Sequence, residues 1–319
     1  MTRHDDVHPA VYPERPRDGA RELAVVAGDP IAARVAPREP APWACPAESE
    51  PRTPPVRSRR GGDAPFGFVP LAVLAVAFLA LPLLALIVRA PWSTLPAELA
   101  APGVLTALRL SLVCSVAAVA ISVFLGVPLA WLLARVRFRG RNLVRAFVLL
   151  PMVLPPVVGG VALLLAFGRQ GLAGQWLDRL FGITLPFSTA GAVLAETFVA
   201  MPFLVITVEA GIRAMDRRYE DAAATLGAGR WTRFRRVTLP LIAPSLGAGA
   251  ALCWARALGE FGATITFAGN FPGTTQTMPL AVYLALQNDP GAAIALSLVM
   301  LAISLTVLVA LRSRWFPSR

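Results

Sequence analysis

Residues 218–246 read RYEDAAATLGAGRWTRFRRVTLPLIAPSL and join two long apolar segments. The stretch begins with two adjacent acids, continues through alanines to Gly227, and carries four arginines between Gly227 and Pro240. Arginine accumulates in the short connections at the inner surface of a membrane. The stretch therefore predicts a membrane-spanning chain in which this link lies on the inner side.

Six segments of the chain are long and apolar enough to cross a hydrocarbon core of ~30 Å as helices of roughly 20 residues. They lie at about 66–88, 109–133, 146–168, 189–211, 241–267 and 291–311. The composition agrees, because 56% of the 319 residues are hydrophobic and only 15% are charged. The segments do not alternate apolar and polar residues as barrel strands do. The predicted fold class is an all-α polytopic membrane protein with about six transmembrane helices.

The positions of the arginines predict the orientation of these helices. The links expected inside contain Arg135, Arg137, Arg139 and Arg141, then Arg213, Arg217, Arg218, Arg230, Arg233, Arg235 and Arg236. The C-terminus adds Arg312, Arg314 and Arg319. The links expected outside contain Arg89, Arg169 and Arg179 at most. We therefore expect both termini to be cytoplasmic in a multi-pass protein of the cytoplasmic (inner) membrane.

The first 65 residues differ in composition from the rest of the chain. They hold 12 prolines and equal numbers of arginines and acids, with no sustained apolar period. Such a segment buries too little surface to offset its ordering entropy. We therefore predict a disordered cytoplasmic N-terminal tail at 1–65 and a transmembrane domain at 66–319. A tethering role, a dispensable extension and a start codon placed too far upstream all remain open for the tail.

The reactive residues of the chain exclude several kinds of chemistry. All 30 basic residues are arginine, which excludes a Walker A lysine or a Schiff-base lysine. The only histidines are His4 and His8, so the apolar region has no histidine for a catalytic triad or a zinc site. The three cysteines are single and widely spaced, as unpaired structural residues are. We expect a chain that is not itself an enzyme, without a metal or a cofactor of its own.

The spacing within the link resembles the EAA loop of type I ABC importer permeases. That pattern is an acid, two alanines, three residues, a glycine, nine residues, and then Ile-x-Leu-Pro. The matching positions here are Asp221, Ala222, Ala223, Gly227, Val237, Leu239 and Pro240. Asp221 replaces the usual glutamate, and the adjacent Glu220 is an alternative source of the carboxylate. In physical terms, the acids favour a helix N-terminus, Gly227 allows the helix to stop, and Pro240 suits the first turn of the next span.

The resemblance covers about residues 105–311 and implies the type I ABC importer permease fold. It also implies that the link forms a coupling helix, which docks on a cytoplasmic ATPase. By the same resemblance, the partners would be a second copy of the chain, two ABC ATPase subunits that hold the ATP and Mg, and an extracytoplasmic binding protein. Membrane lipid surrounds such a chain, and no nucleic-acid partner is expected.

Residues 254–283 indicate the class of substrate. They read WARALGEFGATITFAGNFPGTTQTMPLAVY and look like the corresponding stretch of molybdate permeases. Sulfate permeases are similar here but usually diverge after the Gly-Asn pair. The resemblance therefore implies import of molybdate, with a molybdate-binding protein as partner. A sulfate, thiosulfate or tungstate permease is the nearest alternative, and a gradient-driven secondary anion transporter is a more distant one.

Arg256 and Glu260 stand four residues apart on the predicted fifth span, where they can neutralise one another. A charge inside a membrane is expected to face the bundle interior or a water-filled path. We therefore predict that Arg256, Glu260 and the hydroxyl of Thr264 line the translocation path. A structural ion pair between helices explains the two charges equally well.

Four other features carry open expectations. Small residues recur every fourth position at Ala243, Gly247, Ala251, Ala255, Gly259 and Ala263, which suits a seam between subunits. Glu196 is favoured as a structural hydrogen-bonding residue, because an acid repels an oxyanion. Pro155 and Pro156, followed by two glycines, are expected to break the third span at mid-depth. Residues 277–289 are too short to span and predict a re-entrant or interfacial helix.

Overall fold

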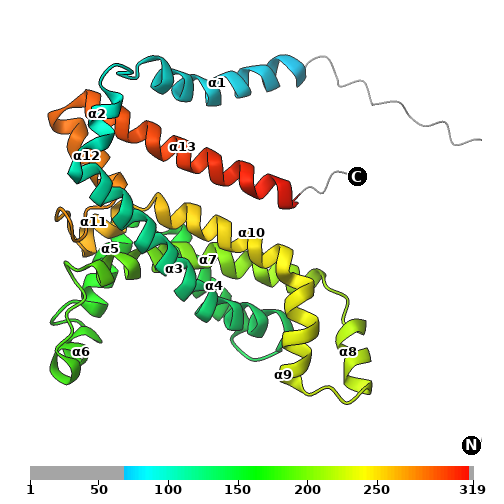
Figure 1. Ribbon diagram of the computed structural model, residues 1–319. Helices are drawn as coiled ribbons and strands as arrows, with labels where there is room; N and C mark the ends of the chain where they lie inside the picture. Colours follow the sequence, from blue (N-terminus) through cyan, green and yellow to red (C-terminus); the bar gives the residue numbers. More distant parts are fainter. Residues whose placement is uncertain (1–67, 316–319) are drawn as a thin grey trace, which may run out of the picture. The chain divides into compact units, whose positions relative to one another are not determined.

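The computed structural model describes residues 68–315, and the predicted tail at 1–65 lies outside this range. Within the described range the chain forms helices and no strand, which confirms the all-α fold class. Figure 1 shows these helices, which are, in chain order, α1 (Phe68–Val88), α2 (Leu95–Ala100), α3 (Pro102–Arg135), α4 (Arg141–Val153), α5 (Pro156–Phe167), α6 (Gly174–Phe181), α7 (Thr189–Ala214), α8 (Arg218–Thr225), α9 (Arg230–Arg233), the π-helix η1 (Phe234–Thr238), α10 (Leu239–Leu258), α11 (Gly262–Phe267), α12 (Met278–Asn288) and α13 (Pro290–Trp315).

Five helices of the described chain are long and apolar enough to cross a membrane, and a bent pair raises the number to six. The five are α1, α3, α7, the run Arg230–Leu258 and the first part of α13, Pro290–Val307. The bent pair is α4 with α5. The five or six candidate spans of the described chain confirm the prediction of about six.

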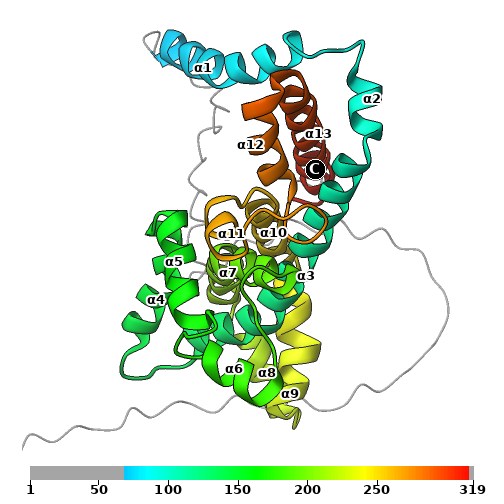
Figure 2. The ribbon, with the colours of Figure 1, turned by 90° about the vertical axis from the view of Figure 1, so that its left-hand side faces the viewer.

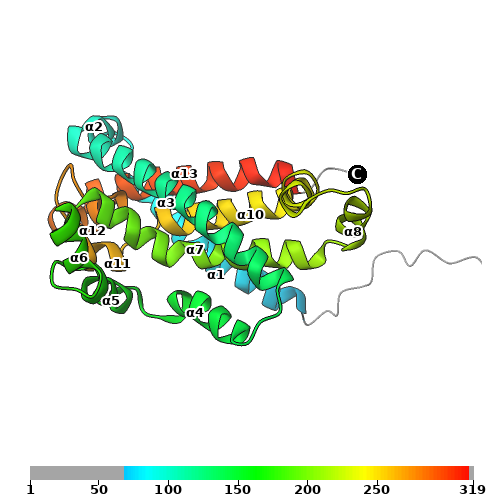
Figure 3. The same cartoon turned by 90° about the horizontal axis from the view of Figure 1, so that it is seen from below.

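The predicted break of the third span, 146–168, is present at Pro155 and Pro156, and it is larger than a kink. The axes of α4 and α5 differ by 119°, and Figure 3 shows two separate helices joined by a short loop. Leu154 and Pro155 are extended, since each precedes a proline, and Pro156 begins the new helix. The glycines that follow have another use, because a Cβ at Gly160 would lie 2.6 Å from Thr266 Cβ of α11. They permit close contact between α5 and α11 (Figure 2).

The fifth predicted span, 241–267, has different ends in the structure. Its helix already begins at Arg230 and continues through η1 into α10, which ends at Leu258. Pro240 has no N–H, and its ring would clash with the carbonyl four residues back in a regular α-helix. The wider π turn relieves this clash, and the N–H of Leu239 donates to the carbonyl of Phe234. Pro240 therefore lies within a continuous helix, and Thr264 lies on the separate helix α11.

The core of the described unit is built around α7, which packs against both α3 and α10 (Figure 3). Small residues bring these helices close, because a Cβ at Gly126 of α3 would lie 2.9 Å from Leu204 Cδ2 of α7. By contrast, α1 has no buried residue. Its apolar surface requires lipid or another chain around it.

The predicted short helix at 277–289 is present as α12, which leads directly into α13. Its first residue is anchored, because the N–H of Met278 donates to Ser111 Oγ of α3 at 2.7 Å. Both atoms belong to buried residues. The contact fixes the beginning of α12 against the core.

Candidate functional site

Helix α8 forms the short helix that the spacing of the link predicts. Asp216 accepts the N–H of Arg218 at 3.0 Å, and the acids Glu220 and Asp221 occupy the first turn. Gly227 has φ +81°, a conformation that side-chain-bearing residues rarely adopt. The N–H of Gly227 donates to Ala224, and that of Ala228 to Ala223, each at 3.0 Å. These two bonds are the Schellman pattern that ends a helix.

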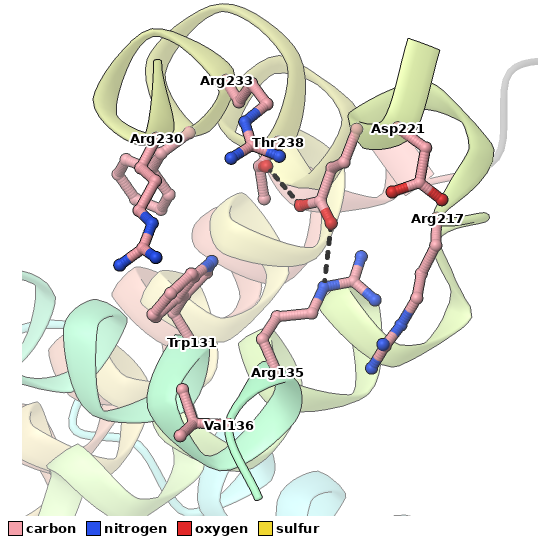
Figure 4. A pocket seen from close by; sticks show the side chains of 10 residues that line it. Trp131, Arg135, Val136, Arg217, Asp221, Arg230, Arg233 and Thr238 are labelled. Carbon is pink, nitrogen blue, oxygen red and sulfur yellow. Dashed lines mark hydrogen bonds and ion pairs between the residues drawn. The ribbon is translucent and has the colours of Figure 1, made fainter. Parts of the chain in front are cut away.

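The two adjacent acids of α8 have different surroundings. Glu220 Oε2 lies 3.3 Å from Arg135 Nε, and Thr238 Oγ1 donates to Glu220 Oε1 at 2.7 Å. Dashed lines in Figure 4 mark both contacts to this carboxylate. Asp221 is exposed. The structure thus separates the two candidates for the carboxylate of the motif, since Glu220 is held within the chain and Asp221 stays accessible.

A cavity of about 360 Å³ is lined by Glu220 and nine other residues (Figure 4). Its polar lining carries more positive than negative charge and comes from α3, α8, α9 and their flanking residues. The lining residues are Trp131, Arg135, Val136, Arg217, Glu220, Asp221, Arg230, Arg233, Phe234 and Thr238. The side chain of Arg135 is only 9% exposed, so its pairing with Glu220 is little screened by solvent.

The outer surface of the link is apolar at several points. Ala222 and Ala224 of α8 are exposed, with Ala223 partly covered. Large side chains beside them are also exposed, with Tyr219 at 58%, Leu226 at 88% and Trp231 at 71%. Exposed apolar side chains beside arginines are candidates for contact with a protein partner. We call Tyr219, Ala222, Ala224, Leu226 and Trp231 the link surface.

The second half of the motif lies apart from the link surface. Val237 lies in the π turn, and Leu239 and Pro240 are the first residues of α10. The motif therefore combines two structural parts, a short exposed helix and the start of a membrane helix.

The predicted path residues Arg256 and Glu260 are in contact. Arg256 Nη2 lies 2.6 Å from Glu260 Oε2, and the Glu260 side chain is 1% exposed. Glu260 Oε1 also accepts the N–H of Ala263 at 2.8 Å, so the carboxylate joins the end of α10 to the start of α11. Thr264 is fully buried within this single chain. The structure brings the two charges together and places the hydroxyl inside the packing of α11.

Sequence reasoning missed a second charged cluster at the α8 end of the bundle. Glu209 of α7 contacts Arg213 Nη2 at 2.7 Å and also pairs with Arg145 of α4. The Arg213 contact is an i, i+4 pair that spacing could have indicated. The Arg145 contact joins α4 to α7 across 64 residues of the chain, so no local spacing indicates it.

Glu196 of α7 is 1% exposed, and its Oε2 has no hydrogen-bond partner among the described residues. The expected structural hydrogen bond is therefore missing at this oxygen. A buried polar atom without a partner costs free energy. Glu196 is thus a buried carboxyl group whose hydrogen bonding is incomplete within the described chain.

The matches of this chain to known proteins fall among transport-system permeases of the inner membrane. Residues 126–316 match the family model described as "Binding-protein-dependent transport system inner membrane component". The molybdenum transport system permease protein of Mycobacterium tuberculosis is 48% identical over 243 residues, covering 76% of this chain and 92% of that relative. Its counterpart in Escherichia coli is 45% identical and covers 66% and 91%. The sulfate transport system permease protein CysT of Escherichia coli is 38% identical and covers 74% and 86%.

A solved structure shares the fold. A bacterial ABC transporter involved in the import of the acidic polysaccharide alginate superposes with a TM-score of 0.61. The superposition covers 78% of this chain and 92% of that chain. The sequence identity is 18%, so the likeness concerns the fold alone.

Proposed function

The chain belongs to the family of binding-protein-dependent transport system inner membrane components, and on that premise we propose that it is the permease subunit of an ATP-driven molybdate importer. The observation that carries the substrate is the 48% identity over 243 residues with a molybdenum permease. The sulfate permease is more distant, at 38%. The chain itself performs no chemistry, because transport requires only a shift between two conformations.

Uptake into proteoliposomes tests the substrate. Molybdate and sulfate are both tetrahedral dianions, so charge alone does not distinguish them. With the complete importer, we expect molybdate uptake to survive a hundredfold excess of sulfate and to fall with an equal excess of tungstate. Equal competition by sulfate would assign the chain to sulfate instead.

The ATPase is a separate pair of subunits that docks on the link surface. A chain without lysine has no Walker A loop of its own. The exposed apolar residues of α8 and the left-handed Gly227 give the importer a compact docking helix on the cytoplasmic side. Uptake that persists without any ATPase subunit would instead indicate a gradient-driven transporter.

The importer contains two copies of this chain, with the path at their two-fold axis. The small residues of α10 and its C-cap support a seam, because Ala243, Gly247, Ala255 and Gly259 are exposed. Among residues 68–315, no atom lies within 4 Å of a Cβ placed at Gly247. Gly247→Leu should lower the dimer fraction of the purified permease. Gly103→Leu is the control, because Gly103 also has no neighbour within 4 Å and lies on α3, away from the row. Unchanged dimerisation of Gly247→Leu would place the seam elsewhere.

The transport cycle follows from these parts. Both termini face the cytoplasm, as the arginine-rich links require. Closure of the ATPase pair moves α8, and the spans rock from inward-open to outward-open. An extracytoplasmic binding protein then releases the oxyanion into a path beside Arg256, the more exposed member of its pair with Glu260. The buried Thr264 would reach the path only after a rearrangement of α11. The compensated pair attracts a dianion weakly, which allows its release.

A further inference from the structure

We propose that Glu220 is a positioning residue whose carboxylate locks α8 to the ends of α3 and η1, so that these elements move as one body when the docked ATPase moves. The proposal rests on the proposed function, since it concerns how docking reaches the membrane helices. It assigns Glu220 a task distinct from the exposed contacts of the link surface.

The geometry places three structural elements around one carboxylate. Arg135 is the last residue of α3, and Thr238 is the last residue of η1. The two oxygens of Glu220 are divided between them, with Arg135 Nε 3.3 Å from Oε2 and Thr238 Oγ1 2.7 Å from Oε1. Thr238 is 1% exposed, and the Glu220 side chain is 17% exposed. The hydrogen bond from Thr238 fixes the direction of the carboxylate, and the ion pair with Arg135 adds attraction to the end of α3 without a hydrogen bond at Nε.

The rest of α8 offers little attachment to the bundle. No residue of α8 is buried, and its packing within the described chain is with η1 and α9. The residues on either side interrupt the helix, because Met215 is extended before α8 and Gly227 is left-handed after it. A helix with so few buried contacts would transmit a movement of the ATPase poorly to the membrane helices. The Glu220 contacts therefore connect α8 to the end of α3, in addition to the packing of α8 on η1 and α9.

The adjacent acid provides a matched control. Asp221 is one residue further along α8 and is exposed, whereas Glu220 faces Arg135. Replacement of either acid by its amide removes one negative charge from the same turn. A difference between the two variants therefore reports the contact with Arg135 and Thr238, and not the net charge of the link.

The test measures uptake and ATP hydrolysis together in the complete importer. Glu220→Gln should keep the ATPase bound and hydrolysing, while molybdate transported per ATP falls about tenfold. Glu98→Gln, which removes an acid of α2 outside the link, should leave this ratio unchanged. Asp221 belongs to the docking motif, so Asp221→Asn serves as the control only in the distance measurement below. Thr238→Val should lower the ratio less than Glu220→Gln, because it removes only the hydroxyl hydrogen bond and leaves the ion pair between Glu220 and Arg135. The double variant Glu220→Gln with Arg135→Gln should be no worse than Glu220→Gln alone, as expected for two members of one contact.

Two outcomes would overturn the proposal. An unchanged ratio in Glu220→Gln would show that the contact does not transmit movement. A parallel loss of hydrolysis and uptake through release of the ATPase would make Glu220 a docking contact. If the wild-type importer moves no oxyanion with ATP, the proposed function fails and the lock must be judged by a second measurement.

That measurement needs no transport. Spin labels at Thr225→Cys on α8 and Phe124→Cys on α3, both exposed positions, report the distance between the two helices. The three native cysteines are replaced by alanine in this background. In the full-length permease we expect a narrow distance distribution that broadens in Glu220→Gln and stays narrow in Asp221→Asn. Equal widths in all three proteins would contradict the lock.

Discussion

Helices α7 and α8 follow one another in the chain and differ in almost every physical respect. Of the most apolar window of α7, 61% is buried, whereas α8 buries no residue. Each depends on a glycine for a different reason. A Cβ at Gly211 of α7 would lie 2.4 Å from Ser245 Cβ, while Gly227 after α8 has no neighbour within 4 Å and a φ of +81°. In α7 glycine provides space for packing, and after α8 it provides a backbone conformation, so α7 supports the fold and α8 presents a surface.

The largest effect is expected from filling the space at Gly211. Gly211→Val should destabilise the permease by about 3 kcal/mol, since Ser245 Cβ belongs to a short side chain that cannot move aside. Thermal unfolding in detergent should show a lowered midpoint, with uptake lost in proportion to folded protein. Adding Ser245→Gly should recover part of the loss. An unchanged unfolding midpoint in Gly211→Val would contradict the conclusion that Gly211 provides space for packing in α7.

Next in size is the change at Gly227. Gly227→Val should cost about 1–2 kcal/mol locally, from the left-handed backbone, and abolish ATP-dependent uptake while the protein stays folded and inserted. Unfolding midpoint and uptake are measured on the same preparation. Gly229→Ala is the control, because Gly229 also has open space but an ordinary φ of −63°. Intact uptake in Gly227→Val would refute the docking role of the link.

A smaller effect should follow removal of one exposed side chain. Leu226 is 88% exposed, so Leu226→Ala should leave stability unchanged and weaken ATPase binding about tenfold, as loss of an interface anchor does. Binding of the ATPase to the permease in nanodiscs gives the affinity. Leu172→Ala is the matched control, because Leu172 is also highly exposed, at 82%, and lies in the connection between α5 and α6. Equal weakening by both variants would show that the effect is not specific to the link surface.

The smallest effect concerns the two acids within α7. Glu196→Gln should leave the unfolding midpoint unchanged or slightly raised, because Glu196 Oε2 has no partner that a charge would satisfy. Glu209→Gln should lower the unfolding midpoint, because it weakens the contacts of Glu209 with Arg145 and Arg213. The loss in free energy of unfolding should be about 1 kcal/mol. A larger loss in Glu196→Gln than in Glu209→Gln would contradict this assignment of the two acids.

The features that were predictable from the sequence are local ones. Apolar length predicted the spans, and the acids and Gly227 predicted the bounds of α8, because each depends on residues within a few turns. The double proline predicted a break before α5. Its size of 119° was not predictable, because it depends on packing between Gly160 and Thr266, far apart in the chain.

The candidate site was predictable only in part for the same reason. Spacing brought Arg256 and Glu260 together, since four residues make one helical turn. No local pattern distinguishes Glu220 from Asp221. Arg135 and Thr238 select Glu220 from two different helices, and that choice exists only after α3, α8 and η1 have packed.

The π turn at Phe234–Thr238 has a consequence for the directions in which side chains point. A π turn holds one more residue than an α turn of the same height, so the helices before and after it are out of phase by about 100°. A helical wheel drawn through Arg230–Leu258 as one regular helix would therefore misplace one of its halves. The turn therefore sets the direction of the basic side of α9 relative to the small-residue side of α10, and the ribbon also bends between these two helices (Figure 1). Loss of one residue from this turn would rotate the arginines away from α8 while leaving both helices intact.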